Sequence, residues 1–450
     1  MNFEVTTEYL QSLELLIDKQ DLQAERDNLN QLHAADLAEI LDRISIDRAK
    51  YLLDILSEEL VADAMVELDE DLRSKFLEDY SSQEIVDELI ENLDSDDAAD
   101  LIGELDDDRK REVLRTIPDP IQAKDLAHLL VYAEDTAGGL MGTELIKVNL
   151  NWKVMQCVKE MRRQAEAIEH VHTVYVVDDE NTLMGTLSLK KLLTTSTKVP
   201  IADVYTKNAQ SVEAMESAEE ASLKMDKYDL VVMPVVDGLG HLIGRITIDD
   251  VVDFMRDEAK EDYNLASGLL EEVESDDTIL TTTRARLPWL LIGLFGGLAA
   301  ASVIGGFEVE LGQIPKMAFF IPLIAAMGGN VGVQSSAIIV QALASKAELG
   351  SFTNRLFKEL GVGLLNGIIC GVCIVGASLF LGYETYLALT VAVALLAVIV
   401  VAALVGTFVP LLLDKYKIDP ALATGPFITT INDILGLFIY FSIGRAILGL

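Results

Sequence analysis

One acidic residue lies deep within an apolar stretch of this sequence. Asp433 stands twelve residues into the segment Ala421 to Leu448. A carboxylate at the centre of a membrane helix costs about 2.5 kcal/mol or more and is retained mostly where it faces an ion, a cavity or a partner group. No lysine or arginine within the apolar segments is well placed to pair with it, so Asp433 predicts a cation site in the membrane. Neutralisation by hydrogen bonds from Thr429, Thr430 or Asn432 is the alternative.

A second apolar segment, Met317 to Ala344, carries two amides. Asn330 and Gln334, at positions i and i+4, share one helix face and follow Gly329, a residue that lets another backbone approach closely. Pro426 interrupts the last apolar segment in a comparable way. Two interrupted helices with oxygen ligands, together with one carboxylate, indicate an ion pathway. Helix packing through small residues is the alternative explanation for the glycines.

The chemistry of these side chains favours a hard cation. All candidate ligands are oxygen atoms, and none of the five histidines lies in an apolar segment. Cys370 and Cys373 form a Cys-x-x-Cys pair in an apolar segment, where they are expected to be core thiols. The sequence has no P-loop, no Gly-x-Ser-x-Gly and no His-Glu-x-x-His motif. We therefore predict that the protein is not an enzyme.

The charge of the chain is unevenly distributed. Its 450 residues have a formal net charge of −38, and the residues before Arg284 hold 65 of the 73 acidic side chains. This imbalance argues against nucleic acid as a partner and makes a cation the natural counterpart. Three cysteines are too few for a disulfide framework, and the N-terminus has no pattern of a cleaved signal peptide.

Short amphipathic helices are predicted for residues 1–130, which form an acidic N-terminal domain. They begin at polar capping residues about every dozen positions, as a loose α-superhelix would require. Examples are Leu32 to Ile44, Ser57 to Leu68, Ser81 to Leu93 and Ser95 to Leu105. Asp94, Asp96, Asp97 and Asp100 crowd one part of this domain, either as a solvated face or as a cation site.

Residues 131–255 repeat one α/β unit. Strands at 173–178 and 183–188 and a helix from Leu189 recur as strands at 231–237 and 242–247 and a helix from Ile248. Each copy resembles a CBS domain, with boundaries at 131–200 and 201–255. Residues 256–283 follow as an acidic connecting helix.

Residues 284–450 are predicted to form a transmembrane domain of five helices, because each apolar segment approaches the ~20 residues that a span needs. The segments are Leu287 to Ile304, Met317 to Ala344, Leu360 to Leu381, Tyr386 to Leu413 and Ala421 to Leu448. Basic residues such as Arg284, Arg286, Arg355 and Lys358 collect on one side. The positive-inside rule then places the N-terminus in the cytoplasm and the C-terminus outside the cell (inner) membrane.

This order of domains, with Pro-x5-Gly-Gly-Asn-x-Gly-x-Gln from Pro322 to Gln334 and Asn-Asp-x-x-Gly from Asn432 to Gly436, resembles the MgtE family of magnesium channels. The resemblance implies a homodimer in the lipid bilayer with a pore on its two-fold axis. In that pore Asp433 would hold hydrated Mg²⁺, and Asp419 would lie at the cytoplasmic mouth. The implied pore-lining residues are Gly329, Asn330, Gln334, Pro426 and Asn432.

The resemblance also implies regulatory Mg²⁺ in the cytosolic part. The acidic positions assigned to it are Asp96, Asp100, Glu219, Asp250, Asp253, Glu258, Glu261 and Asp262. Without Mg²⁺ these faces should repel one another, and bound Mg²⁺ should draw them together and close the pore. A coupled secondary transporter or exporter of Mg²⁺, Mn²⁺ or Co²⁺ is the alternative, since broken helices and a buried carboxylate serve either mechanism. A CBS receptor without transport leaves Asp433 and Asn330 unexplained.

Two positions depart from the family pattern. CBS domains that bind adenine nucleotides usually have an Asp three residues after the Ser/Thr that ends the last strand, which is Asp250 in the second copy but Lys191 in the first. ATP or AMP, if bound, is therefore expected to bind weakly and through Asp250 of the second copy. Gly425 stands where some relatives carry Asn, and the missing side-chain oxygen is expected to alter selectivity among divalent ions.

Overall fold

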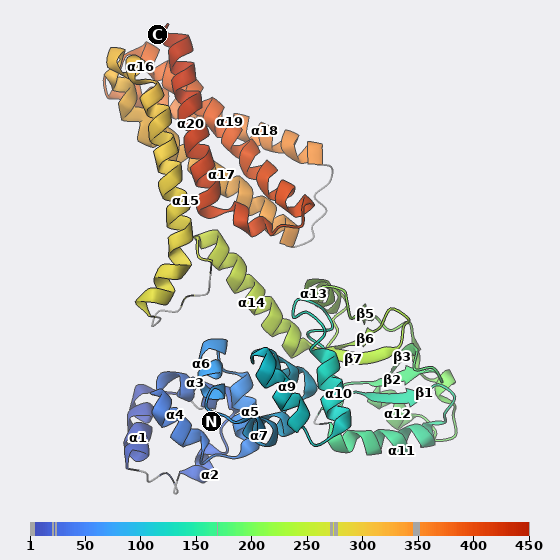
Figure 1. Ribbon diagram of the computed structural model, residues 1–450. Helices are drawn as coiled ribbons and strands as arrows, with labels where there is room; N and C mark the ends of the chain where they lie inside the picture. The colour runs from blue at the N-terminus through green and yellow to red at the C-terminus, as the bar shows by residue number, and fades with distance from the viewer. Residues whose placement is uncertain are drawn as a thin grey trace. The chain divides into compact units, whose positions relative to one another are not determined.

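The computed structural model describes residues 5–19, 22, 25–168, 170–270, 273, 278–344 and 352–449. The chain divides into two compact units, Met1–Met255 and Arg256–Leu450. The first unit contains an all-helical part and two small sheets, and the second contains long apolar helices (Figure 1). The predicted architecture is present in the described residues: a helical N-terminal part, two copies of an α/β unit, and five helices long and apolar enough to span a membrane.

Ten α-helices lie in the described part of residues 1–130. Short polar residues start several of them: the Ser81 hydroxyl accepts from the Glu84 backbone N–H, and the Glu84 carboxylate accepts from the Ser81 N–H. The helices are α1 (Thr7–Asp18), α2 (Arg26–Leu29), α3 (Ala34–Arg43), α4 (Ile46–Leu53), α5 (Glu58–Val66), α6 (Glu70–Leu77), α7 (Ser82–Glu84), α8 (Ser95–Gly103), α9 (Asp107–Thr116) and α10 (Pro120–Leu129).

The expected helix Ser81 to Leu93 is not one regular α-helix. After the first turn the backbone passes through a π-helical turn at Ile85–Leu89 and a 3-10 turn at Ile90–Asn92. Ile85, Leu89 and Ile90 are all completely buried. The change of helical pitch therefore lets consecutive apolar side chains face the same core.

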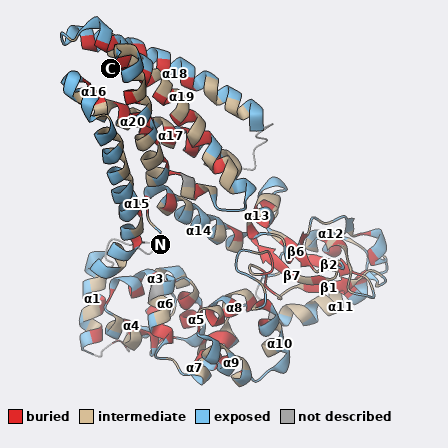
Figure 2. Ribbon diagram, turned by 45° about the horizontal axis from the view of Figure 1, so that its top comes forward, coloured by how far each residue is buried: buried red, intermediate tan, exposed pale blue. Residues whose placement is uncertain are grey.

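Each CBS copy has its own sheet. The first has four strands in the order β1 (Ile146–Asn149), β2 (Val174–Val177), β3 (Leu183–Leu187) and β4 (Thr206–Lys207), with helices α11 (Val154–Gln164) and α12 (Leu189–Thr194). The second has β5 (Val212–Glu213), β6 (Val232–Val236) and β7 (Leu242–Thr247), with helix α13 (Ala218–Lys227). In both, a parallel pair is followed by an antiparallel one. The strands are largely buried (Figure 2).

The two copies contact each other across their sheets. The Leu183 backbone N–H donates to the Gly240 carbonyl at 3.0 Å, and the Leu242 N–H donates to the Asn181 carbonyl at 3.0 Å. Tyr175, Val177 and Leu242 are buried between them. This interface is the product of duplication, because equivalent strand edges of the two copies bond to each other.

Helix α14 (Ile248–Ser267) follows the last CBS strand without a break. Asp250 stabilises its start by accepting from the backbone N–H of Thr247 at 3.1 Å and from the Thr247 hydroxyl. α14 covers the first half of the predicted connecting helix 256–283. Residues 271, 272 and 274–277 of that segment lie outside the described residues.

Five helices in the second unit are long and apolar enough to cross a membrane. They are α15 (Ile279–Gly306), α17 (Ile321–Ala344), α18 (Phe352–Phe380), α19 (Thr385–Lys415) and α20 (Gly425–Leu448), with the short α16 (Glu308–Gln313) between the first two. α15 and α18 begin about eight residues earlier than the apolar runs predicted, because polar residues such as Thr281 and Glu359 continue the helices.

Small residues set the spacing between these helices. α19 packs against α17, α18 and α20 (Figure 1). A Cβ atom on Gly406 of α19 would lie 2.4 Å from the Gly332 carbonyl oxygen of α17, so both glycines are required for this close approach. Gly363 and Gly367 also bring α18 close to α19, where added Cβ atoms would lie 3.2 Å and 3.1 Å from the Cα atoms of Val400 and Leu396.

Candidate functional site

Asp433 of α20 lies beside Gly329 of α17. It is half-buried on α20, and a Cβ atom on Gly329 would lie 3.8 Å from its Oδ1 atom. The next residue on α17, Asn330, is exposed, as is Gln334 one turn later. The structure therefore places Gly329 and Asp433 together and leaves the two amides on an open face of the helix.

Asn432 occupies a different environment from its neighbour Asp433. Its side chain is only 1% exposed and packs into the space left by Gly332, where a Cβ atom would lie 1.8 Å from its Nδ2 atom. The sequence grouped Asn432 with the pore-lining residues, whereas within this chain it lies between α17 and α20.

Four carboxylates line one pocket at the other end of the second unit. Glu258, Glu261 and Asp262 come from α14, and Asp419 comes from the turn before α20. The Oδ1 atom of Asp419 also accepts from the Ala421 backbone N–H at 2.8 Å, which fixes this turn. A pocket walled only by carboxylates suits a hydrated divalent cation.

The start of α20 explains the glycine at position 425. Gly425 has a φ of +56°, and a Cβ atom there would lie 2.5 Å from the Ala266 carbonyl oxygen of α14. Pro426 similarly contacts Gly268, whose φ is +80°. Any side chain at position 425 would strain the backbone and push the end of α14 away, so glycine permits this contact.

A second acidic group lies at the start of α8. Ligand atoms of Asp94, Asp96 and Glu144 all lie within 4.8 Å of one another. The Glu144 carboxylate accepts from the Ser95 backbone N–H at 3.2 Å and from the Ser95 hydroxyl at 2.9 Å, so it caps α8 from 49 residues away. From the sequence, Asp94 and Asp96 belong to one acidic cluster and Asp96 is a regulatory position, whereas Glu144 was missed because nothing in the local sequence signals it.

The carboxylates here are held close to like charges. Burial, followed by the charge of Asp250, raises the pKa of Asp96 well above its ordinary value. Burial and the same Asp250 charge raise the pKa of Asp97 to about 7. Burial raises the pKa of Asp250 itself to about 6, against the opposing hydrogen bonds from Thr247. Asp96 and Asp97 of the helical part therefore face Asp250 of the second CBS copy closely enough to repel it.

One arginine is embedded in this acidic group. Arg245 of β7 is 7% exposed, donates from Nε to the Glu144 carbonyl, and pairs through Nη2 with Asp94 Oδ2 at 3.3 Å. Its single positive charge offsets only part of the negative charge. The remaining charge is available to a cation with oxygen ligands.

The other predicted regulatory residues lie outside this triad. Asp100 follows one turn after Asp96 on α8, and Asp253 follows Asp250 on α14, both exposed. Glu219 lies in the first turn of α13. Among the predicted acidic positions, Asp96 lies in the triad, and Glu258, Glu261 and Asp262 line the pocket with Asp419. Asp100, Asp253 and Glu219 lie outside the triad.

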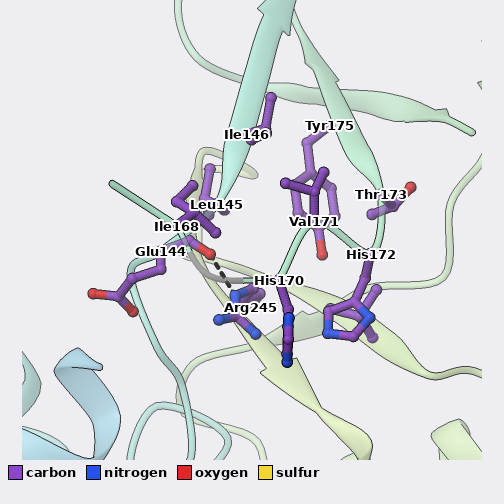
Figure 3. Close-up of a pocket in the computed structure, with 11 residues that line it drawn as sticks. Glu144, Leu145, Ile146, Ile168, His170, Val171, His172, Thr173, Tyr175 and Arg245 are labelled. Atoms are coloured by element: carbon purple, nitrogen blue, oxygen red, sulfur yellow. Dashed lines mark hydrogen bonds between the residues drawn. The ribbon is translucent and has the colours of Figure 1, made fainter. Parts of the chain in front are cut away.

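A narrow pocket opens beside the first CBS copy (Figure 3). Tyr175 is 1% exposed, and its hydroxyl has no hydrogen-bond partner among the described residues. Its oxygen points towards the side of the pocket where His170 and Arg245 lie. The pocket therefore contains an unsatisfied phenol beside a guanidinium that already pairs with Asp94.

Comparison with known proteins decides the family. Residues 321–443 match the family model described as a divalent cation transporter (MgtE), residues 32–135 match the MgtE intracellular N domain, and residues 137–197 and 201–257 match CBS domains. The magnesium transporter MgtE of Thermus thermophilus is 34% identical over 442 residues, which cover 97% of this chain and 98% of that protein. The chain belongs to the MgtE family.

Other members agree with this assignment. The magnesium transporter MgtE of Enterococcus faecalis is 36% identical over 323 residues, covering 72% of this chain and 71% of that protein. A crystal structure of the cytosolic domain of the Mg²⁺ channel MgtE in complex with ATP is similar over 54% of this chain and 99% of that one, at 29% identity and a TM-score of 0.51. MgtE relatives are transporters, which supports the prediction that this protein is not an enzyme, and the chain is a multi-pass membrane protein.

Replacement of Asp96 by Asn tests the repulsion within the acidic group. We expect Asp96→Asn to raise the thermal unfolding midpoint of the full chain in detergent without Mg²⁺ by roughly 2–4 °C, because one buried charge is removed. Added Mg²⁺ should then stabilise the variant less than the parent. Asp108→Asn is the matched control, since the Asp108 side chain is 96% exposed. Equal Mg²⁺-induced shifts in all three proteins would show that this acidic group binds no cation.

Proposed function

We propose that this MgtE protein is a Mg²⁺-selective channel whose pore is lined by α17 and α20. The observation that carries the proposal is the position of Asp433 beside Gly329 on α17, next to the exposed amides of Asn330 and Gln334. Carboxylate and amide oxygens can hold the first hydration shell of Mg²⁺, an ion that loses its water reluctantly. A pathway that keeps the ion hydrated needs no binding pocket of exact ligand geometry.

In a homodimer, the second copy of the chain would form the other side of this pathway. The face of α17 that carries Asn330, Gln334 and Gln341 is exposed in a single chain, although amides are costly against hydrocarbon. Two copies related by a two-fold axis would place these faces and both Asp433 carboxylates around one central path. In this proposal the N-terminus lies in the cytoplasm, as the basic residues near Arg284 and Lys358 favour.

Loss of the Asp433 charge should stop transport. We expect Asp433→Ala and Asp433→Asn to lower Mg²⁺ uptake into proteoliposomes at least about tenfold, because the loss of ~1.4 kcal/mol of ion stabilisation already has that effect. The Asn variant keeps the side-chain size and isolates the charge.

The control is Glu384→Gln, because the Glu384 side chain is 78% exposed and pairs only with Lys316 among the contacts of the described residues. Parental uptake rates by a folded Asp433→Ala protein would contradict this placement of the pore. Uptake that requires an imposed proton or Na⁺ gradient would instead indicate a coupled transporter.

Gating by Mg²⁺ is proposed for the acidic residues of α14 and α8. α14 carries Asp250, Asp253, Glu258, Glu261 and Asp262 along one continuous helix, and its end contacts the start of α20 at Gly425. Mg²⁺ bound in the pocket with Asp419 would hold that contact in place. Cation binding would thus favour the closed conformation by its higher affinity for that state.

Neutralisation of α14 should separate conduction from closure. A variant with Asp250→Asn, Asp253→Asn, Glu258→Gln and Glu261→Gln should conduct in a planar bilayer but no longer close as Mg²⁺ rises on the cytosolic side. The parent should also resist protease more strongly across residues 130–280 when Mg²⁺ is added.

The matched control neutralises four exposed carboxylates of the N-terminal helices, Glu8, Asp27, Asp47 and Asp108. This control should close normally because it leaves α14 intact. Normal closure by the α14 variant, with digestion rates that do not respond to Mg²⁺, would show that the acidic surface is only a solvated face.

ATP is the third element of the proposal, supported by the related cytosolic domain that was solved with ATP. From the sequence, ATP or AMP is expected to bind to the second copy through Asp250. In this chain Oδ2 of Asp250 accepts two hydrogen bonds from Thr247, and the pocket with Tyr175 and Arg245 is lined by residues of both copies. We place the nucleotide at this pocket, whose volume of about 10 Å³ in this conformation would have to widen to admit it.

The Tyr175 hydroxyl gives a sharp test of this site. Tyr175→Phe removes one oxygen that bonds to nothing else in the described chain, so the fold should be preserved while ATP binding weakens roughly five- to tenfold. Calorimetry on the full chain measures this, with Tyr263→Phe as the control at an exposed tyrosine. Binding that survives Tyr175→Phe but is lost in Asp250→Ala would return the site to the second copy.

A further inference from the structure

One polar contact joins α17 to α18 on the side away from the amides. Ser335 of α17 is 5% exposed, and its hydroxyl donates to Oε1 of Glu359 on α18 at 2.6 Å. This hydrogen bond joins the two helices directly through their side chains. Glu359 thus has a specific partner on a helix proposed to line the pore.

The position of Glu359 is fixed by the way α18 packs. Glu359, Gly363, Gly367 and Gly371 follow one another at intervals of four residues and therefore share one helix face. The three glycines of this face approach α19 at Val400, Leu396 and Ala392. Glu359 continues the same stripe one turn earlier, where it reaches past α19 to Ser335.

α17 is held from behind by two contacts. Gly332 packs against Asn432 of α20 and Gly406 of α19, and Ser335 bonds to Glu359. Ser335 comes five residues after Asn330, which corresponds to about 140° around the helix axis, and Gly332 lies about 200° from Asn330. Both contacts are therefore on the side opposite Asn330.

We propose that the Ser335–Glu359 hydrogen bond fixes the rotation of α17 so that Gly329 and Asn330 face the Asp433 side of the ion path. Glu359 is a positioning residue and does not touch the ion. Close packing at Gly332 sets the distance between the helices, and the directional hydrogen bond at Ser335 additionally opposes rotation of α17 about its axis. The loss of that bond leaves a carboxylate near the start of α18 without its Ser335 partner. This inference rests on the proposed role of α17 in the pore.

Three variants separate the bond from the charge. Glu359→Gln keeps an oxygen that accepts from Ser335, whereas Glu359→Leu and Ser335→Ala remove the bond. We expect the last two to lower Mg²⁺ uptake into proteoliposomes roughly fivefold or more and to admit Ca²⁺ more readily relative to Mg²⁺, as the loss of one charge-assisted bond would predict. Glu359→Gln should keep most of the uptake and the parental Ca²⁺/Mg²⁺ ratio. The double variant Ser335→Ala/Glu359→Leu should be no worse than either single variant.

Ser378→Ala is the matched control, because Ser378 is a buried serine of α18 whose hydroxyl has no partner among the described residues. It should transport like the parent. Parental uptake and selectivity in both Ser335→Ala and Glu359→Leu would overturn the inference, as would equal defects in Glu359→Gln and Glu359→Leu beside a normal Ser335→Ala. Where Glu359→Leu does not fold, the comparison of Ser335→Ala with Glu359→Gln still decides. Failure of the pore proposal itself would give a different result, because a folded Asp433→Ala protein would then take up Mg²⁺ at the parental rate.

Discussion

Negative charge without enough positive charge nearby is the constraint on which this structure depends. Asp96 and Asp97 face Asp250 across the boundary between the helical part and the second CBS copy, and burial raises the pKa of each. The single positive charge of Arg245, which pairs with Asp94, is too small to balance these negative charges. The chain holds these groups together through neutral contacts, such as the backbone hydrogen bond from Gly142 to Arg245 and the cap that Glu144 places on α8. A cation that binds oxygen ligands would replace this repulsion with attraction between the helical part and the second CBS copy.

Small residues solve a different problem in the membrane helices. Helices in lipid gain little from apolar burial, so they associate where backbones can approach closely. Gly332 serves this purpose twice, because it accommodates both Asn432 and the backbone next to Gly406. Gly332 lies on the side of α17 opposite Asn330, so this close packing takes place away from the exposed amides. One face of α17 therefore serves helix packing and the other presents polar side chains.

Much of this could be predicted from the sequence, and the failures have physical causes. Period-two strands, capping residues and apolar length gave the CBS copies and the five spans because these signals are local. The irregular helix at Ile85–Asn92 was missed because the pitch change depends on a core that the local sequence does not contain. Glu144 was missed for the same reason, since its partner Ser95 lies 49 positions earlier. Asn432 was grouped with Asp433 by adjacency, although neighbours on a helix point about 100° apart.

Glu359 illustrates the general limit of reading spans by hydropathy. The apolar run Leu360 to Leu381 begins after it, and Arg355 and Lys358 stand just before it. In the structure α18 begins at Phe352, which makes Glu359 an internal residue of the helix with a buried serine as its partner. A carboxylate at the end of a span can be hydrated by water or hydrogen-bonded by a neighbouring helix. The amino-acid composition of the segment is the same in both cases. The glycine stripe that follows it at four-residue intervals is the feature that separates them, because it shows which face of the helix is turned towards its neighbours.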